Sequence, residues 1–401
     1  MSTLKVDGIR SNSASSDAIT LASDGTCTAN ITNKSNRNLI INGAMQVAQR
    51  GTSSTSTGIQ TVDRFGMTAS GTDETPTQQQ VDVSAPSSPY HLPTSGAHPY
   101  KEGFRKAYGL TNGNQTSGAG TTDRVNIYYN VEAQDIANSG WDYTDPNSYI
   151  TLSYWIKSSV GQNFYHRIYS YDGTAQGYCW ETGTLTAFTW TKITKKIPGN
   201  ANLTFDNNTE AGLYIVFAAY SGTNYTNDKS LDSWAAFASD NRFPNQTSTW
   251  YTTNDASFQI TGVQLEVDNT GSGVATDFEH RSYGQELFLC QRYYQVVMSE
   301  DPLQRCGGLG GTPYANGERL YCPHIFTQEM RAKPTVASSG SGTFRSRLGD
   351  NVSFDGFSGT NDHNQRSATF MTDSGHSNGN VGEYHWIETS DNAFLTLSAE
   401  L

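Results

Sequence analysis

The feature that most constrains this fold is a block of alternating strand-like sequence enclosed by two apolar segments. The first segment is NLIINGAM at residues 38–45, and the second is FQITGVQLEV at residues 258–267. A first and a last strand that enclose such a block are what a jelly-roll sandwich requires, because its two ends pair in space. The sequence therefore predicts one large antiparallel β-sandwich over residues 38–281.

Inside this block apolar side chains recur at every second position. The pattern is clearest over 125–131, 150–156 and 213–217, where polar or amphipathic residues fill the alternate positions. This period of two predicts strands with one buried and one wet face. In the last strand the apolar parity changes after Thr261 and Gly262, which predicts a β-bulge there.

The rest of the chain divides into smaller units. Residues 1–37 predict a few short strands for attachment or oligomerisation, residues 282–300 a connecting helix, and residues 301–401 a second, smaller β-sandwich. Residues 68–122 have the least pattern and predict long loops with a few edge strands. We expect an all-β fold with one short helix.

The connecting helix carries a narrow apolar stripe. Its members are Tyr283, Leu287, Cys290, Tyr294 and Val297, spaced alternately by four and three residues. The stripe is too short for an independent coiled coil. It predicts either a helix packed on its own sandwich or a seam at an oligomer axis.

Charge and composition exclude several classes of partner. Charged residues make up only 16% of the chain and the net charge is −12, so nucleic acid and anionic membranes are poor partners. The longest apolar run, Leu213–Tyr220, is too short to cross a bilayer, and the N-terminus lacks the apolar core of a signal peptide. Five scattered cysteines predict free thiols in a protein made in a reducing cytoplasm.

Several segments resemble tail-fibre and related appendage proteins of bacteriophages. NLIINGAMQVAQRG with TVDRF resembles the opening of a carbohydrate-binding-module-like jelly roll, and ITGVQLEV with VATDFEHRSYGQELFLCQRYYQ resembles its end. YITLSYWIKSS and EMRAKPTV are also similar to that family. LKVDGI with DAITLASDGTC resembles the attachment segment of fibres from phages of marine cyanobacteria.

The resemblance implies a virion protein assembled in the host cytoplasm. It implies a homotrimer that docks to other phage tail or capsid proteins through residues 1–37 and touches a host surface glycan. We expect no cofactor, although jelly rolls of this kind often hold a structural calcium ion, for which Asp255 is the one candidate ligand. The resemblance transfers no ligand-contacting residue.

One stretch suits sugar binding, which uses flat aromatic faces beside polar groups. Tyr165, Arg167, Tyr169 and Tyr171 share one face of an expected strand. Two further candidates on the next strand are Tyr178 and Trp180. The alternative is that this face is sandwich core or an oligomer contact; Arg167 favours an exposed face.

Residues 1–37 cannot bury a core by themselves, and their apolar positions predict contact with other chains. Together with the helix stripe, they define the candidate interface residues of a trimer: Leu4, Val6, Ile9, Ile19, Leu21, Tyr283, Leu287 and Tyr294.

Catalysis has weaker support. GHSNG at 375–379 matches the pattern of a nucleophile elbow, but its flanks lack the strand and helix that such an elbow requires. The histidines show no metal-ligand spacing. We therefore expect a non-enzymatic tail fibre that binds host glycan. The alternatives are a polysaccharide-degrading or deacetylating virion enzyme, and a head-decorating or tail-bracing protein without receptor contact.

Overall fold

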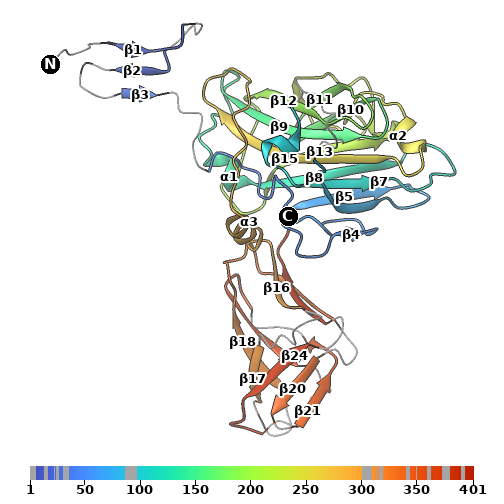
Figure 1. Cartoon of the computed structure of the whole chain (residues 1–401), viewed down its shortest axis with the longest axis vertical. Coiled ribbons are helices and arrows are strands. Elements are labelled where there is room, and N and C mark those ends of the chain that lie inside the picture. The colour runs from blue at the N-terminus through green and yellow to red at the C-terminus, as the bar shows by residue number, and fades with distance from the viewer. Residues whose placement is uncertain are drawn as a thin grey trace.

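A computed structural model shows a chain built from β-sheets (Figure 1). It describes residues 6–12, 17–21, 23, 27–29, 36–85, 97–299, 309–313, 315, 319–339, 344–348, 350–358, 363–372, 380–389 and 393–401. A large sandwich occupies the centre, a small sheet from the N-terminus stands apart from it, and a second β unit extends away on the other side.

The central sandwich consists of two antiparallel six-stranded sheets, as the alternating pattern predicts. The first sheet has the order β14 (Trp234–Ala236), β11 (Gln176–Thr184), β10 (Asn163–Ser170), β13 (Ala211–Ser221), β8 (Arg124–Glu132) and β5 (Phe65–Ser70). The second sheet has the order β12 (Thr191–Pro198), β9 (Tyr149–Ser158), β15 (Ser257–Asp268), β7 (Lys106–Thr111), β6 (Thr77–Asp82) and β4 (Ser53–Ser54). Their inner faces form one continuous apolar core.

The predicted bulge is confirmed in β15, which runs through the middle of the second sheet. Its pairing with β9 shifts register between Thr261 and Gln264, and Gly262 has φ 63°. The bulge lets the side chains of Phe258, Ile260, Val263 and Leu265 all reach the core, where each is fully buried. The extra residue in β15 thus keeps the apolar side chains on the buried face although they change from even to odd positions.

The predicted opening strand at 38–45 is wrong as a strand. This segment forms turns, because Asn42 and Met45 adopt left-handed φ angles of 61° and 58°. It nevertheless lies along β15: the amide of Leu39 donates to the carbonyl of Leu265 at 2.9 Å, and Val263 donates to Gly43 at 2.9 Å. A Cβ atom at Gly43 would collide with the Val263 carbonyl, so glycine permits this close approach.

The expectation of loops with edge strands over 68–122 is also wrong in part. β6 and β7 lie inside the second sheet, and β7 pairs with both β6 and β15. The sequence TQQQVD of β6 hides this role because its glutamines are polar. Gln78 is nevertheless fully buried, and its side chain bonds the hydroxyl of Tyr108 at 3.0 Å and the carbonyl of Gly58 at 3.1 Å.

Short helical segments occupy connections around the sandwich. They are the 3₁₀ turns η1 (Pro99–Glu102) and η2 (Thr223–Tyr225) and the helices α1 (Ala133–Ala137) and α2 (Thr249–Thr252). α1 directly continues β8, so that it holds Asp135 at the end of the first sheet.

The connecting helix is shorter than predicted. α3 spans Tyr283–Cys290 and begins with a capping box between Ser282 and Gln285. The chain then enters β16 (Tyr294–Ser299), so the predicted helix stripe through Tyr294 and Val297 is wrong. Tyrosine and valine favour strand, and pairing of β16 with β25 overrides the helical spacing.

The C-terminal unit is the second, smaller sandwich. One sheet contains β16, β25 (Phe394–Ser398) and β19 (Thr335–Ser338). The other has the order β21 (Asp350–Phe354), β20 (Phe344–Leu348), β24 (His385–Thr389), β17 (Leu309–Pro313), β18 (Leu320–Ile325), β23 (Ser367–Thr372) and β22 (Phe357–Ser358). A separate apolar cluster fills this unit. The GHSNG segment lies outside the described residues.

The N-terminal strands form a sheet of their own, with β2 (Ile19–Leu21) between β1 (Gly8–Ile9) and β3 (Cys27–Ala29). Figure 1 shows this sheet away from the sandwich. Val6, Ile9 and Leu21 are exposed at 39%, 52% and 39%. The chain joins the sandwich at Asn36, whose amide donates to Glu279 at 2.7 Å.

Candidate functional site

The predicted glycan residues begin on β10, whose two faces differ sharply. The even positions, including His166 and Ile168, are fully buried between the sheets. Tyr165, Arg167 and Tyr169 occupy the outer face by the alternation of the strand. Tyr171 follows the end of β10 and is 43% exposed.

Tyr178 and Trp180 are wrong as glycan candidates. β11 pairs with β10 so that Tyr178 lies opposite Ile168 and Trp180 opposite His166, which turns both rings into the core. They are 2% and 0% exposed, and the indole of Trp180 donates to the hydroxyl of Tyr154 at 3.0 Å. Aromatic content alone does not reveal parity, which only the strand register decides.

A connected group of rings lies on the outer face of the first sheet. We name it the tyrosine face; it consists of Tyr128, Tyr169, Tyr171, Tyr214 and Phe237. The ring centroids of Tyr128 and Tyr214 are 5.5 Å apart, those of Tyr214 and Tyr169 5.1 Å, and those of Tyr169 and Phe237 5.0 Å. Tyr171 lies 4.9 Å from Tyr169. The face therefore crosses β8, β13 and β10 and reaches the residue after β14.

Sequence reasoning missed Tyr128 and Tyr214, although a signal was present. Each occupies a polar position of an alternating strand: Tyr128 between Ile127 and Tyr129, and Tyr214 between Leu213 and Ile215. Gly66 on β5 pairs with Tyr128, and a Cβ atom there would collide with the Tyr128 ring. Glycine thus gives this ring room to lie across the neighbouring strand.

Arg167 lies beside the tyrosine face and is 6% exposed. Its guanidinium carbon is 4.6 Å from the ring centre of Tyr169, 5.2 Å from that of Phe237 and 5.5 Å from that of Phe243. Burial lowers the pKa of Arg167 to about 10. The expectation that Arg167 marks an exposed surface is wrong for this side chain, because the rings of Tyr169, Phe237 and Phe243 lie against it.

Tyr165 belongs to a different neighbourhood. It packs partly buried against the small cluster of Cys179, Val216, Ala218 and Phe243. Burial, and next the charge of Glu181, raises the pKa of its hydroxyl. Tyr165 therefore shares the outer face of β10 with Tyr169 but is not packed into the tyrosine face.

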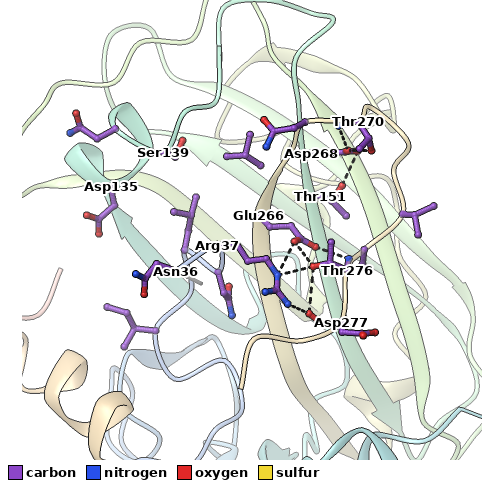
Figure 2. A pocket seen from close by; sticks show the side chains of 18 of the residues that line it. Asn36, Arg37, Asp135, Ser139, Thr151, Glu266, Asp268, Thr270, Thr276 and Asp277 are labelled. Carbon is purple, nitrogen blue, oxygen red and sulfur yellow. Dashed lines mark hydrogen bonds and ion pairs between the residues drawn. The ribbon is translucent and has the colours of Figure 1, made fainter. Parts of the chain in front are cut away.

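A second feature is a cleft of about 1070 Å³ beside α1 and the end of β15 (Figure 2). Its lining comes from five parts of the chain: the segment before the sandwich, α1 and the residues after it, β9, the end of β15 with the connection that follows, and α3. The lining residues include Asn36–Leu39 and Ile41, Gln134, Asp135, Asn138 and Ser139, Thr151, Glu266 to Arg281 in part, and Leu289. The sequence alone indicates no such cleft, because its walls are far apart along the chain.

The polar groups of this cleft bind mainly one another. Arg37 donates to the hydroxyl of Thr276 at 2.8 Å, and its guanidinium lies 3.5 Å from the carboxylate of Glu266. Glu266 in turn accepts the amide of Thr276 at 2.9 Å and its hydroxyl at 2.6 Å. Figure 2 shows this closed network at one wall. It holds the connection after β15 against the strand.

Two other acids of the cleft, Asp268 and Asp135, have pKa values shifted in opposite directions. Although burial opposes ionisation, bonds from Gly273 and Thr270 lower the pKa of Asp268 overall. Asp135 is exposed as a residue, yet desolvation at the cleft, and next the charge of Glu132, raises its pKa to about 6. With this pKa, Asp135 changes its protonation near neutral pH.

The calcium prediction at Asp255 gains no support. Asp255 is an exposed residue with φ 56° in the turn before β15, and Asn254 donates to it at 3.3 Å. Among the described residues, no group of three or more His, Cys, Asp or Glu side chains is arranged to hold a metal ion.

The interface candidates fall in different places. Val6, Ile9, Leu21 and Tyr283 are exposed, whereas Ile19 and Leu287 are partly buried. Tyr294 is wrong as a helix residue, since it lies in β16 with Arg50 3.5 Å above its ring centre within the same chain. Leu4 lies outside the described residues. In the part of the chain that the structure describes, no helix is long and apolar enough to cross a bilayer.

No family model and no curated protein matches the chain. Among solved structures it is similar to the enzymatically active domain of tailspike protein 4 of bacteriophage CBA120, at 9% identity and TM-score 0.28. That match covers 58% of this chain and 21% of the tailspike chain, so this chain spans about a fifth of the tailspike chain's length.

Carbohydrate-binding modules also show similarity. The N-terminal cellulose-binding domain of a β-1,4-glucanase from Cellulomonas fimi matches at 12% identity and TM-score 0.24, covering 55% of this chain and 98% of that domain. A family 11 module of a Clostridium thermocellum cellulase matches at 12% and 0.24, covering 54% and 95%. These scores are too low to carry an argument about function. The observed sheets themselves establish the all-β sandwich fold.

Proposed function

We propose that this protein is a non-enzymatic, glycan-binding structural component of a phage virion, acting as a trimeric tail fibre. The observation that carries the proposal is the tyrosine face. Rings of this kind present flat apolar surfaces with a hydroxyl at the edge, which suits the C–H faces and hydroxyls of a sugar. Tyr171, exposed at 43%, provides the accessible end of the face.

The packing of the rings supports a binding role. Tyr128, Tyr169 and Tyr214 are only partly buried, although they occupy the outer side of a sheet whose inner side already has a continuous core. Connected aromatic surface outside the core is typical of a binding site. Because the rings brace one another at about 5 Å, little side-chain freedom is lost on binding.

The arrangement of the units supports the fibre role. The small sheet β1–β3 stands apart and exposes Val6, Ile9 and Leu21, so contact with sister chains or with tail or capsid proteins would cover them. The sandwich and the C-terminal unit then extend away from that attachment. We place the protein in the virion, after assembly in the host cytoplasm, with a host surface glycan as its ligand.

Two of the acids that line the cleft, Glu266 and Asp268, do not suit the role of hydrolase carboxylates, whereas Asp135 and Asp277 also line it. A hydrolase needs two carboxylates free to act on substrate. Here Glu266 is 4% exposed and is occupied by Thr276 and Gln264, while Asp268 is bound by its own connection. These acids hold the cleft wall together.

Two measurements test the proposal together. Immunogold labelling of purified particles should place the chain at the tail, and labelling on the head would favour the decorating or bracing alternative. An array of bacterial surface polysaccharides should show retention of the purified protein without loss of polymer length. Shortened polymer would instead support the enzyme alternative.

A further inference from the structure

Three arginines lie in a row beside the tyrosine face, joined through aromatic rings. Arg167 and Arg242 both lie against Phe237, at 5.2 Å and 5.7 Å from its ring centre. Arg242 and Arg124 both lie against Tyr225, at 4.7 Å and 5.2 Å. We name Arg124, Arg167 and Arg242 the arginine row.

Among the residues that the structure describes, the arginine row has no acid partner. In the continuously described stretch 97–299, none of the three guanidinium groups has a carboxylate oxygen within 4.0 Å. The Nε atoms of Arg124 and Arg167 are buried without a hydrogen-bond partner. The guanidinium group of Arg242 donates to the carbonyl of Ser239, at 2.8 Å.

This absence is unusual for an acidic chain. The sequence has 38 acidic and 26 basic residues, so there are enough acidic side chains to pair with each lysine and arginine. Other arginines do so: the buried Arg64 binds Glu400 at 2.6 Å, and the partly buried Arg292 binds Glu132 at 2.7 Å. Aromatic faces offset only part of the cost of burying a cation.

The cations of this face also repel one another. Besides burial, the charge of Arg124 lowers the pKa of Arg242, and that of Arg242 lowers the pKa of Arg167. Lys229 is part of the same group, since burial and then the charge of Arg167 act to lower its pKa. Asp228 and Asp240 are exposed on the same connection, but neither lies within 4.0 Å of a described cation. An external anion would relieve this repulsion.

We propose that the tyrosine face and the arginine row together bind an acidic glycan, that is, a chain of sugar rings bearing carboxylate, sulfate or phosphate groups. This inference rests on the proposed function. The rings take the sugar faces, and the partly exposed Arg124 and Arg242 take the anionic groups through charge-assisted hydrogen bonds. Arg167, which rings cover, adds its positive charge from beneath them. The net charge of −12 opposes nucleic acid over the whole surface, but this local row carries the opposite sign.

Calorimetry with defined oligosaccharides tests the inference. The probes are an alginate hexasaccharide for carboxylates, a carrageenan hexasaccharide for sulfates, and neutral cellohexaose and laminarihexaose. The acidic probes should bind at least tenfold more tightly than the neutral ones at low salt, and the difference should shrink as salt rises. The better acidic probe identifies the anionic group.

Charge variants provide the decisive comparison. Arg242→Gln should weaken binding of the acidic probe about tenfold and leave the neutral probes unchanged. Arg242→Lys should retain part of the preference for acidic over neutral probes, because it keeps the positive charge. If Arg242→Gln does not fold, Arg124→Gln serves for the same test. Lys106→Gln removes one charge from the other sheet, where Lys106 pairs with Asp82, and should change nothing.

The outcomes separate the two proposals. Equal affinity for neutral and acidic probes, unaffected by Arg242→Gln, overturns the acidic specificity and leaves glycan binding intact. No binding of any saccharide, with no effect of Tyr171→Ala on host adsorption, overturns the proposed function itself. If linear polyphosphate binds as tightly as the acidic saccharides and Tyr171→Ala does not change its affinity, the surface binds anions in general. That result overturns the further inference.

Discussion

The guanidinium group of Arg64 stacks on the ring of Tyr293, 3.4 Å from its centre. Arg64 precedes β5 of the central sandwich, and Tyr293 lies between α3 and the C-terminal unit. The hydroxyl of Tyr293 donates to Glu132 at 2.5 Å, which fixes the ring against β8. This contact links the two sandwiches, and it lies within the VDRF and QRYY segments that carry the family resemblance. These residues therefore help to hold the two sandwiches together.

Glu400 completes this junction by binding Arg64 at 2.6 Å and Arg50 at 3.0 Å. Glu400→Gln should lower the free energy of unfolding by about 3 kcal/mol, because Arg64 is left buried without a full counter-charge. Denaturant titration measures this. Glu329→Gln is the control, since Glu329 pairs with Arg366 on the surface and should cost under about 1 kcal/mol. Equal losses in both variants would refute the role of Glu400.

Tyr171→Ala should weaken host adsorption by about 1–3 kcal/mol, because it removes the accessible ring of the tyrosine face. Stability should change by less than about 1 kcal/mol, since Tyr171 is 43% exposed. Phe188→Ala, which removes a ring 73% exposed elsewhere, is the control and should adsorb normally. A large fall in melting temperature would instead assign Tyr171 to packing.

Arg167→Met should raise the free energy of unfolding by about 1 kcal/mol, because an apolar chain of similar length replaces a buried cation without an acid partner. The same variant should lose affinity for acidic glycans, which is the expected exchange between stability and function. Arg64→Met is the matched comparison and should destabilise, because it removes one of the two arginines that bind Glu400. Destabilisation by Arg167→Met would show that its ring contacts outweigh burial of the charge.

His166 predicts acid sensitivity of the central sandwich. Burial lowers its pKa to about 3 from the ordinary 6.5, and its Nδ1 lies 2.6 Å from the hydroxyl of Tyr154. Between pH 6.5 and pH 3, His166 is therefore protonated in the unfolded chain but neutral in the folded chain. The stabilising contribution is complete above pH 6.5 and falls by about 1.4 kcal/mol per pH unit from there toward pH 3.

Denaturant titrations between pH 7 and pH 4 measure this slope. In His166→Phe the contribution of this group should vanish, giving a flatter dependence on pH than in the natural chain. His280→Phe is the control, because His280 is an exposed residue outside the core, beside Phe104. An unchanged slope in His166→Phe would contradict the assignment.

Deletion of residues 1–35 should leave a folded remainder that no longer enters particles. The structure places the boundary before Asn36, because Asn36 and Asn38 both donate to Glu279 of the sandwich. Light scattering should report three chains for the complete protein and one for the truncated form. A complete protein that is monomeric at micromolar concentration would contradict the trimer, and truncated protein found in virions would contradict the attachment role.

The outer position of Tyr169 could be predicted because alternation along β10 is a local property of a strand. The burial of Tyr178 in the core could not be predicted from the sequence, since it depends on which residue of β10 lies opposite Tyr178 in the sheet. The cleft is a stronger case: Arg37 and Thr276 meet only after the segment before the sandwich and the connection after β15 are brought together. No local pattern encodes such a contact.

The sequence by itself determined the all-β class, the two sandwiches, the bulge after Thr261 and the outward parity of Tyr169, because each follows from short-range periodicity and turn chemistry. Only the tertiary structure decided that Trp180 is core, that β16 is a strand, and that Arg167 lies among aromatic rings. Those outcomes depend on pairing and packing between distant segments, where burial of apolar surface and register outweigh local preference.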